Sequence, residues 1–186
     1  MKSAYSALLK SLPVEGAPHG VTLQAVSRVW KSRAPSKVVA LSWQLLLDRM
    51  PSKLNLVMRG VPLPIGGLGC VFCNAPSESS AHLFLLCPSI FPMWYQVSRW
   101  LGWEFVTPID LVQQFLYFTG LGGGRRVRLG VLLVWHVVIW TIWTSRNDLI
   151  FSGGTLSEEP VVDRVKLLAW RWFLAKCPAS SCTYHE

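Results

Sequence analysis

Apolar side chains recur at the spacing of an α-helix along almost the whole chain. The pattern predicts helices at residues 2–12, at 22–32, from Ser36 to about Pro51, at 53–59, from Pro88 to about 101, from Thr107 or Pro108 to about 119, at 126–150, and from Ser157 or Glu158 to about 173. Segments 13–20 and 61–69 are rich in proline and glycine, which interrupt regular structure, so both are predicted linkers. The predicted fold class is mainly α, and no internal repeat is visible.

Short polar residues stand where several of these helices are expected to begin. Thr22, Ser36 and Ser52 each precede an apolar run, and their hydroxyl oxygens can accept a hydrogen bond from a free backbone N–H in the first turn. Pro51 is expected to end or kink the helix that Ser36 caps, and Gly60 to stop the one that Ser52 caps. The sequence therefore predicts two capped helices that meet at a sharp corner.

Composition and charge add the expectation of a partner. Hydrophobic residues make up 51% of the chain and charged residues 15%, and there are ten tryptophans, so some apolar surface must be covered by a partner, a membrane or self-association. Residues 1–60 hold nine Lys or Arg and two acidic residues, which leaves +7 of the net charge of +8 in this part. Such a cluster favours contact with a polyanion. The alternative is an ordinary solvated set of helix faces.

The apolar segment from Leu129 to Thr144 requires a test for membrane spanning. As a helix it would reach about 24 Å, which is less than the roughly 30 Å hydrocarbon core of a bilayer. His136 in its middle would also be costly in lipid. We therefore predict a buried core helix, with a membrane span as the alternative.

Four potential metal ligands lie close together in the sequence CVFCNAPSESSAHLFLLC, with the spacing Cys70-x2-Cys73-x8-His82-x4-Cys87. Three thiolates and one imidazole can close a tetrahedron around a soft ion, which favours one structural Zn2+ with no open position for an activated water. The alternative is three unlinked buried thiols and a surface histidine. The expected architecture is thus a set of short helices flanking a small Cys3His zinc-binding module, with a long apolar helix in the C-terminal half.

The remaining cysteine and histidine residues are not expected to bind metal. Cys177, Cys182 and His185 lack a fourth ligand near a chain end, His136 fits a core histidine, and His19 lies in a linker. Five cysteines are an odd number and no secretory signal is evident, so we expect a reducing, intracellular location, nuclear or cytoplasmic.

Catalytic motifs are not apparent in the sequence. The acidic residues form no pair that could hold two metal ions, and no Ser/His/Asp arrangement is visible. The glycines at 120–124 are followed by two arginines, not by the Lys and Ser/Thr of a phosphate-binding loop. We expect no enzyme activity and no small-molecule substrate.

The chain resembles the reverse-transcriptase zinc-binding domain found near the C-terminal end of plant non-LTR (LINE-type) retrotransposon polyproteins. The resemblance runs through KSAYSALL, VWKSRAPSKVVALSWQLLLDRMPSKLNLVMRG, CVFCNAPSESSAHLFLLCP and MWYQVSRWLGW, and more loosely through 137–151 and 161–176. It implies that the family's metal ligands are Cys70, Cys73, His82 and Cys87. It also implies an accessory nucleic-acid-binding segment that acts downstream of polymerase and endonuclease domains, and we expect the chain to be a fragment of such an open reading frame.

These observations predict three segments and a binding role. The segments are a basic helical part at 1–69, the zinc-binding module with its following helix at 70–101, and a tryptophan-rich helical part at 102–186, with about 28–105 as the core of the family domain. RNA or DNA is the expected partner, held by the phosphate backbone and some aromatic stacking. The alternatives are a module that docks on a reverse transcriptase domain and, less favoured, a membrane-associated protein. The residues predicted to contact nucleic acid are Lys31, Arg33, Lys37, Arg49, Lys53 and Arg59.

Overall fold

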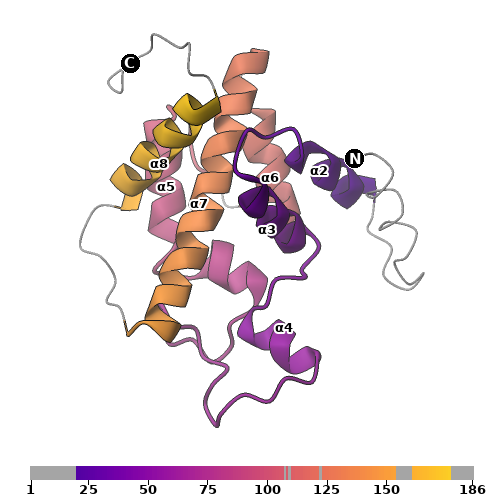
Figure 1. Cartoon of the computed structure of the whole chain (residues 1–186), viewed down its shortest axis with the longest axis vertical. Helices are drawn as coiled ribbons and strands as arrows, with labels where there is room; N and C mark the ends of the chain where they lie inside the picture. The colour runs from indigo at the N-terminus through magenta and orange to yellow at the C-terminus, as the bar shows by residue number, and fades with distance from the viewer. Residues whose placement is uncertain (1–19, 107, 109, 122, 154–160, 177–186) are drawn as a thin grey trace.

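The computed structural model describes residues 20–106, 108, 110–121, 123–153 and 161–176 (Figure 1). This part of the chain is helical and contains no strand. The helices are α2 (Gly20–Val29), α3 (Ser36–Leu46), α4 (Lys53–Met58), a single π-helical turn η2 (His82–Leu86), α5 (Phe91–Trp100), α6 (Leu111–Gly120), α7 (Arg125–Phe151) and α8 (Val161–Lys176). The mainly α fold class is confirmed, and the predicted helix at 2–12 lies outside the described residues.

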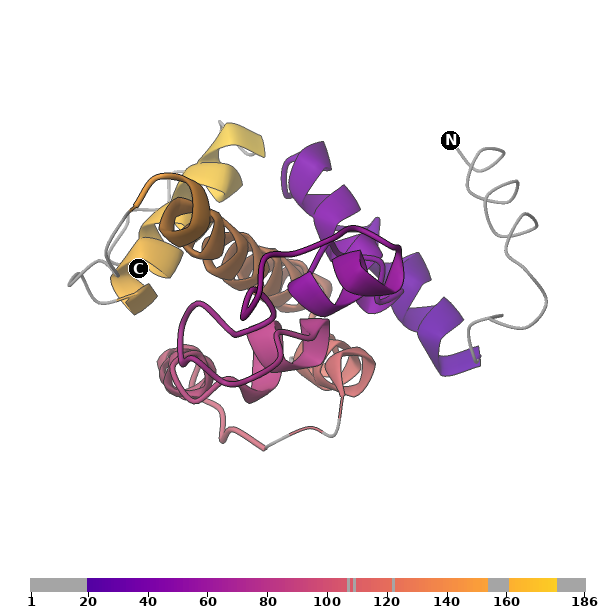
Figure 2. The same cartoon turned by 90° about the horizontal axis from the view of Figure 1, so that it is seen from below.

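Helix α7 runs through the centre of the molecule. It packs against α3, α6, α8 and η2, while α2 lies on α3 and α6, and α5 lies on α8 and η2. Figure 2 shows α7 between α8 on one side and α2 and α3 on the other. The N-terminal and C-terminal helices therefore share one core, with α7 as its axis.

The core explains why α7 is apolar on all sides. Val131 to Ile139 are all buried, because neighbouring helices cover α7 from several directions. The Trp135 ring meets Phe115 of α6 edge-on, with ring centroids 4.7 Å apart, and its Nε1 donates a hydrogen bond to Gln114 Oε1 at 2.8 Å. The buried indole N–H of Trp135 on α7 thus has its partner on α6, one of the helices that cover it.

The membrane alternative can now be weighed by length and burial. Helix α7 is longer than the apolar segment alone, and by length and composition it could cross a membrane. However, 61% of its most apolar window is buried inside the protein. Burial, and not length, favours the core helix that the sequence predicted.

The corner between α3 and α4 follows the prediction in outline. Ser52 caps α4, because its Oγ accepts a hydrogen bond from Asn55 N–H at 3.3 Å. Helix α3 ends at Leu46, earlier than the predicted stop at Pro51. The chain leaves the helix through Asp48, whose φ of 51° lies in the left-handed region. Asn55 Nδ2 then fixes the corner by donating to the Asp48 and Met50 carbonyl oxygens, both at 3.0 Å.

Several predicted helix starts were wrong. Ser36 is the first residue of α3 and not its cap; Pro35 occupies the cap position with φ −54° and ψ 142°, an extended geometry that proline favours. Thr22 lies inside α2. The N-cap of α6 is Asp110, whose Oδ1 accepts from Gln113 N–H at 2.8 Å, and not Thr107 or Pro108.

The helix expected to start at Pro88 also begins later. The carbonyl of Cys87 accepts hydrogen bonds from Ile90 N–H at 2.9 Å and Phe91 N–H at 2.8 Å, which closes a turn over Pro88 before α5 starts. Pro92 instead occupies the first turn of α5. This turn holds Cys87 beside the cluster described next.

Candidate metal centre and basic residues

The four predicted metal ligands converge. The ligand atoms of the four side chains, one from each residue, all lie within 4.8 Å of one another; the residues are Cys70, Cys73, His82 and Cys87. Cys70 Sγ lies 3.9 Å from Cys87 Sγ, and Cys73 Sγ lies 3.2 Å from His82 Nε2. Around a tetrahedral zinc, Zn–S bonds of about 2.3 Å and Zn–N bonds of about 2.0 Å put such atoms about 3.5–3.8 Å apart. The donor set and its spacing therefore fit one zinc ion.

A tight turn presents the first two cysteines. Cys70 N–H donates to the Ala75 carbonyl at 2.8 Å, and Asn74 N–H donates to the Cys70 carbonyl at 2.9 Å. Asn74 adopts a φ of 59°, which asparagine tolerates better than most residues. The turn thereby brings the Cys73 thiol back toward Cys70.

The π-helical turn η2 presents the other two ligands. Cys87 N–H donates to the His82 carbonyl at 2.8 Å, a hydrogen bond that spans five residues. In an α-helix, with 3.6 residues per turn, a residue five positions on would lie about 140° around the axis. The wider π turn reduces this rotation, so the His-x4-Cys spacing can present both side chains to one ion.

The electrostatics of the thiols differ from one another. Burial raises the pKa of Cys70, and it raises the pKa of Cys87 to about 12. Burial also acts to raise the pKa of Cys73, but hydrogen bonds from the Ala75 backbone and from the thiols of Cys87 and Cys70 outweigh it, so this pKa is lowered. Zinc needs thiolates as ligands, so metal binding would release protons from the buried pair. With four protein ligands the site is closed, which makes it a structural site and not a catalytic one.

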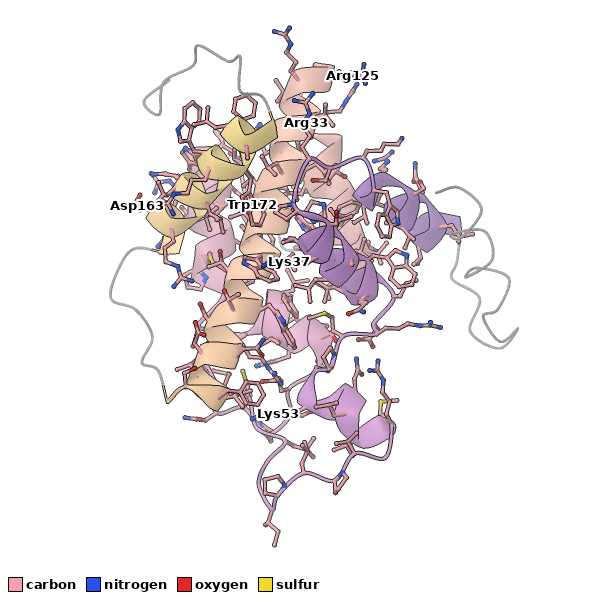
Figure 3. The ribbon with its side chains drawn as sticks, viewed as in Figure 1. Arg33, Lys37, Lys53, Arg125, Asp163 and Trp172 are labelled. Carbon is pink, nitrogen blue, oxygen red and sulfur yellow. The ribbon has the colours of Figure 1, made fainter. Side chains whose placement is uncertain are left out.

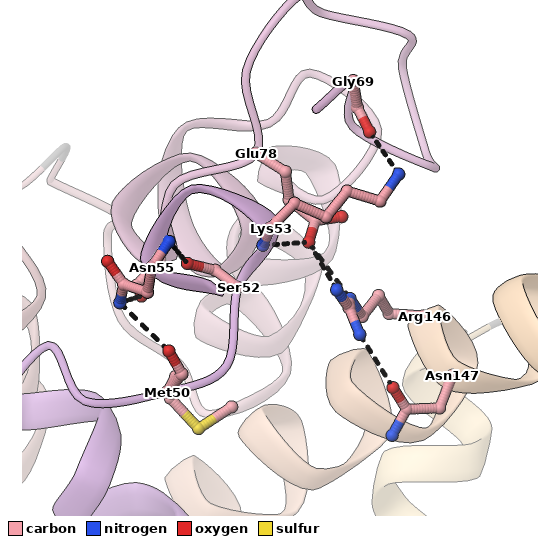
Figure 4. Close-up of polar contacts among 9 residues, drawn as sticks. Met50, Ser52, Lys53, Asn55, Gly69, Glu78, Arg146 and Asn147 are labelled. Carbon is pink, nitrogen blue, oxygen red and sulfur yellow. Dashed lines mark hydrogen bonds and ion pairs between the residues drawn. The ribbon is translucent and has the colours of Figure 1, made fainter. Parts of the chain in front are cut away.

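A buried carboxylate ties the ligand loop to α7. Glu78, between Cys73 and His82 in the sequence, is 0% exposed. Its Oε1 accepts hydrogen bonds from Arg146 Nε at 3.1 Å, Arg146 Nη2 at 2.8 Å and the Lys53 backbone N–H at 3.2 Å (Figure 4). Sequence reasoning missed this ion pair. The available signal was an acidic residue inside the ligand loop and an arginine inside an otherwise apolar helix.

The six cations predicted to bind nucleic acid do not form one patch. Figure 3 shows Arg33 near Arg125 at the first turn of α7, Lys37 near the middle of α7, and Lys53 toward the opposite end. Lys37 Nζ lies 4.7 Å from the centroid of the Trp140 ring. Lys31 and Arg33 line a cavity together with arginines of α2 and α7.

Two of the predicted cations make contacts within the corner and the ligand loop. Lys53 is half-buried, and its Nζ donates to the Gly69 carbonyl at 2.6 Å, just before the first metal ligand. Arg59 is exposed, and its Nη2 donates to the Arg49 carbonyl at 2.7 Å. These contacts give Lys53 and Arg59 a structural role at the corner between α3, α4 and the loop.

The tryptophans contribute more to the core than to the surface. Trp30 and Trp100 are exposed, and the other eight of the ten are buried or half-buried. Trp94, for example, is fully buried and donates from Nε1 to the Phe84 carbonyl of η2 at 2.7 Å. The apolar composition is thus largely explained by the core.

One comparison with known proteins gives a match. The family model for zinc-binding in reverse transcriptase matches residues 1–94, a range that includes α2, α3, α4, η2 and all four converging ligand residues. No curated protein and no solved structure matches the chain.

Proposed function

Because the chain belongs to the family of zinc-binding domains in reverse transcriptases, we propose that it is a non-catalytic module that binds RNA or single-stranded DNA through the phosphate backbone. The family is an accessory zinc-binding domain and not the catalytic one. We further propose that it comes from a plant LINE-type element and acts beside a polymerase domain inside the cell, in the nucleus or cytoplasm. The quoted resemblance of residues 29–60 and 70–88 supports this origin.

The observation that carries the proposal is the surplus of exposed positive charge in residues 20–60, on α3 and on the turns and loops beside the N-terminal helices. Lys31, Arg33, Lys37, Arg49 and Arg59 are all exposed, and Asp48 is the only acidic residue between positions 20 and 60. Two ion pairs join residues that the structure describes, Arg146–Glu78 and Lys166–Asp163, and Lys31, Lys37, Arg49 and Arg59 take part in neither. Exposed cations attract phosphates and release counterions when they bind them.

An exposed ring lies within the same basic stretch of sequence. Trp30 precedes Lys31 directly, is 48% exposed, and is backed by the Trp43 ring with centroids 6.5 Å apart. A ring held in this way offers a platform on which an unpaired base can stack, and such stacking is tolerant of sequence. This favours a single strand over a duplex as the ligand.

In this proposal the Cys3His set of metal ligands has a structural role. It would close the loop that carries Glu78, and Glu78 in turn holds the corner at Lys53 and helix α7 at Arg146. The nucleic acid would then lie beside the metal and not on it.

The test is a fluorescence anisotropy titration with labelled single-stranded RNA and DNA of about 16 nucleotides over a series of salt concentrations. The logarithm of affinity should fall linearly with the logarithm of salt, with a slope of about −0.7 for each phosphate contacted on a single strand. Lys31→Gln and Trp30→Ala should weaken binding, whereas Arg171→Gln, an exposed cation on α8, should not. Affinity that is independent of salt would count against a phosphate-dominated contact.

The alternative of a protein-docking module rests on a different surface. Exposed apolar side chains gather on α4 and the loop that follows it, at Val57, Met58, Val61 and Ile65, and Met58 is 77% exposed. Such a patch is typical of a protein contact. Co-purification with a reverse transcriptase domain after nuclease treatment, lost in Met58→Glu, would favour docking over an RNA-bridged contact.

A further inference from the structure

A basic cavity lies where α2, α6 and α7 meet. It has a volume of about 770 Å3, and its walls include Arg28, Lys31, Arg33, Arg125 and Arg128, with Leu129 on the α7 side. This volume is in the range of roughly 300–1,000 Å3 that is usual for small-ligand sites. The cavity therefore has room for a group the size of a nucleotide.

The charges around this cavity have one sign. Five of its lining residues are cationic, and none of the lining residues that the structure describes is acidic. Arg28, Lys31 and Arg33 come from the end of α2 and the loop after it, whereas Arg125 and Arg128 come from the first turn of α7. A concave surface lined by one sign of charge focuses its potential and attracts counter-ions of opposite sign.

Helix stability does not account for the arginines at the start of α7. The first turn of α7 has no acidic residue, and Gly124 at its N-cap provides no side-chain hydrogen bond. Cations at this end of a helix oppose the helix dipole, and an anion would be favoured there. An anion bound in the cavity would offset the unfavourable interaction of Arg125 and Arg128 with the helix dipole. It would also offset the repulsion among the cations that line the cavity.

We propose that this cavity holds phosphate groups of the nucleic-acid backbone, with Arg125 and Arg128 as binding residues alongside Arg28, Lys31 and Arg33. The inference rests on the proposed function and locates its main contact. The site includes residues of α7 that lie outside the family-matched range 1–94. From the rise per residue, it lies about 30 Å along α7 from Arg146, which contacts the ligand loop through Glu78, so the cavity and this contact are near opposite ends of the helix.

The first test removes charge from α7 in the double variant Arg125→Gln/Arg128→Gln, with the same labelled RNA and DNA strands. One phosphate contact contributes about 0.7 to the slope of log affinity against log salt. Lowering the salt from about 1 M to about 0.1 M therefore strengthens binding about fivefold for each such contact. Losing two contacts should therefore weaken binding by about 25-fold and reduce the slope by about 1.4. The control Arg99→Gln/Arg171→Gln changes net charge equally at exposed residues of α5 and α8, and should leave affinity within about twofold.

The second test adds charge instead of removing it. Gly120 lines the cavity at the end of α6, and a Cβ at this position would meet no atom within 4 Å. Gly120→Glu should therefore fold normally and weaken binding at least tenfold, whereas Gly120→Gln, of nearly the same size, should bind like the parent. Circular dichroism and zinc content check that each variant is folded.

The outcomes separate this inference from the proposed function. Weaker binding by Arg125→Gln/Arg128→Gln and by Gly120→Glu, with both controls unchanged, supports the cavity. A parent that binds in a salt-dependent manner while these two variants bind equally well overturns the cavity and leaves the proposed function standing. A parent that binds neither RNA nor DNA overturns both.

Discussion

Replacing Arg146 by methionine should destabilise the protein more than any surface substitution. Arg146 is 4% exposed, and its guanidinium donates two of the three hydrogen bonds that Glu78 Oε1 accepts. Among the described residues, Glu78 Oε2 is buried without a hydrogen-bond partner. Arg146→Met would leave a buried carboxylate with the Lys53 backbone N–H as its remaining donor.

The expected magnitude follows from this burial. Removing one partner of a buried ion pair costs about 3–5 kcal/mol, because the other charge stays buried without compensation. Total unfolding free energies are about 5–15 kcal/mol, so the loss is a large fraction. The double variant Glu78→Gln/Arg146→Met should lose less than Arg146→Met alone, because no uncompensated charge remains.

The assay is urea unfolding with zinc present, followed by circular dichroism, with a double-mutant cycle over Glu78 and Arg146. The matched control is Lys166→Met, which breaks the surface pair Lys166–Asp163, whose side chains are 33% and 61% exposed. That loss should stay within about 1 kcal/mol. The reasoning is refuted if Arg146→Met costs less than about 1 kcal/mol, or if the double variant is no more stable than Arg146→Met.

Three further predictions concern the metal ligands, the corner and a core histidine. Metal analysis should find about one zinc per chain in the parent and none in His82→Ala or Cys87→Ala; full zinc content in Cys87→Ala would contradict the ligand set. Asn55→Ala should lower the unfolding free energy, measured in urea, by about 1–3 kcal/mol, because it leaves the buried Met50 carbonyl without its donor; an unchanged midpoint would contradict this. Burial lowers the pKa of His136 from 6.5 to about 4. As the pH falls, the unfolded chain therefore takes up the proton before the folded protein does. The free energy of unfolding should fall by about 3 kcal/mol between pH 6.5 and pH 4. His136→Gln, which keeps the zinc ligands, should lack this part of the pH dependence.

Local patterns in the sequence predicted a considerable part of the structure. The four ligands lie within residues 70–87. The Cys-x2-Cys and His-x4-Cys spacings were therefore enough to predict that they converge. The apolar run at 129–144 predicted the buried centre of α7, because an uninterrupted apolar segment of this length must be covered. The cap at Ser52 was likewise predictable, since its partner, Asn55 N–H, is three residues away.

Helix ends were less predictable, because they depend on groups that compete with the local signal. Ser36 has the residue type of a cap, yet Pro35 already has the extended backbone that a cap requires. Pro88 has the residue type of a first-turn residue, yet the Cys87 carbonyl draws the chain into a separate turn. In both places a neighbouring group decided where the helix begins.

The sequence by itself determined that the four potential metal ligands converge, that the fold is helical and that α7 is buried, because these features depend on residue types at short, regular spacing. The tertiary structure alone decided which distant groups meet: Glu78 with Arg146, Ser42 Oγ with His136 Nδ1 at 2.7 Å, and the cations of residues 28–33 with Arg125 and Arg128. Pairing and charge clustering of this kind depend on how helices pack in space, and short-range spacing carries no information about it. The sequence therefore predicted Lys31 and Arg33 of the proposed phosphate site, and Arg28, Arg125 and Arg128 joined them only once α7 was packed beside the N-terminal helices.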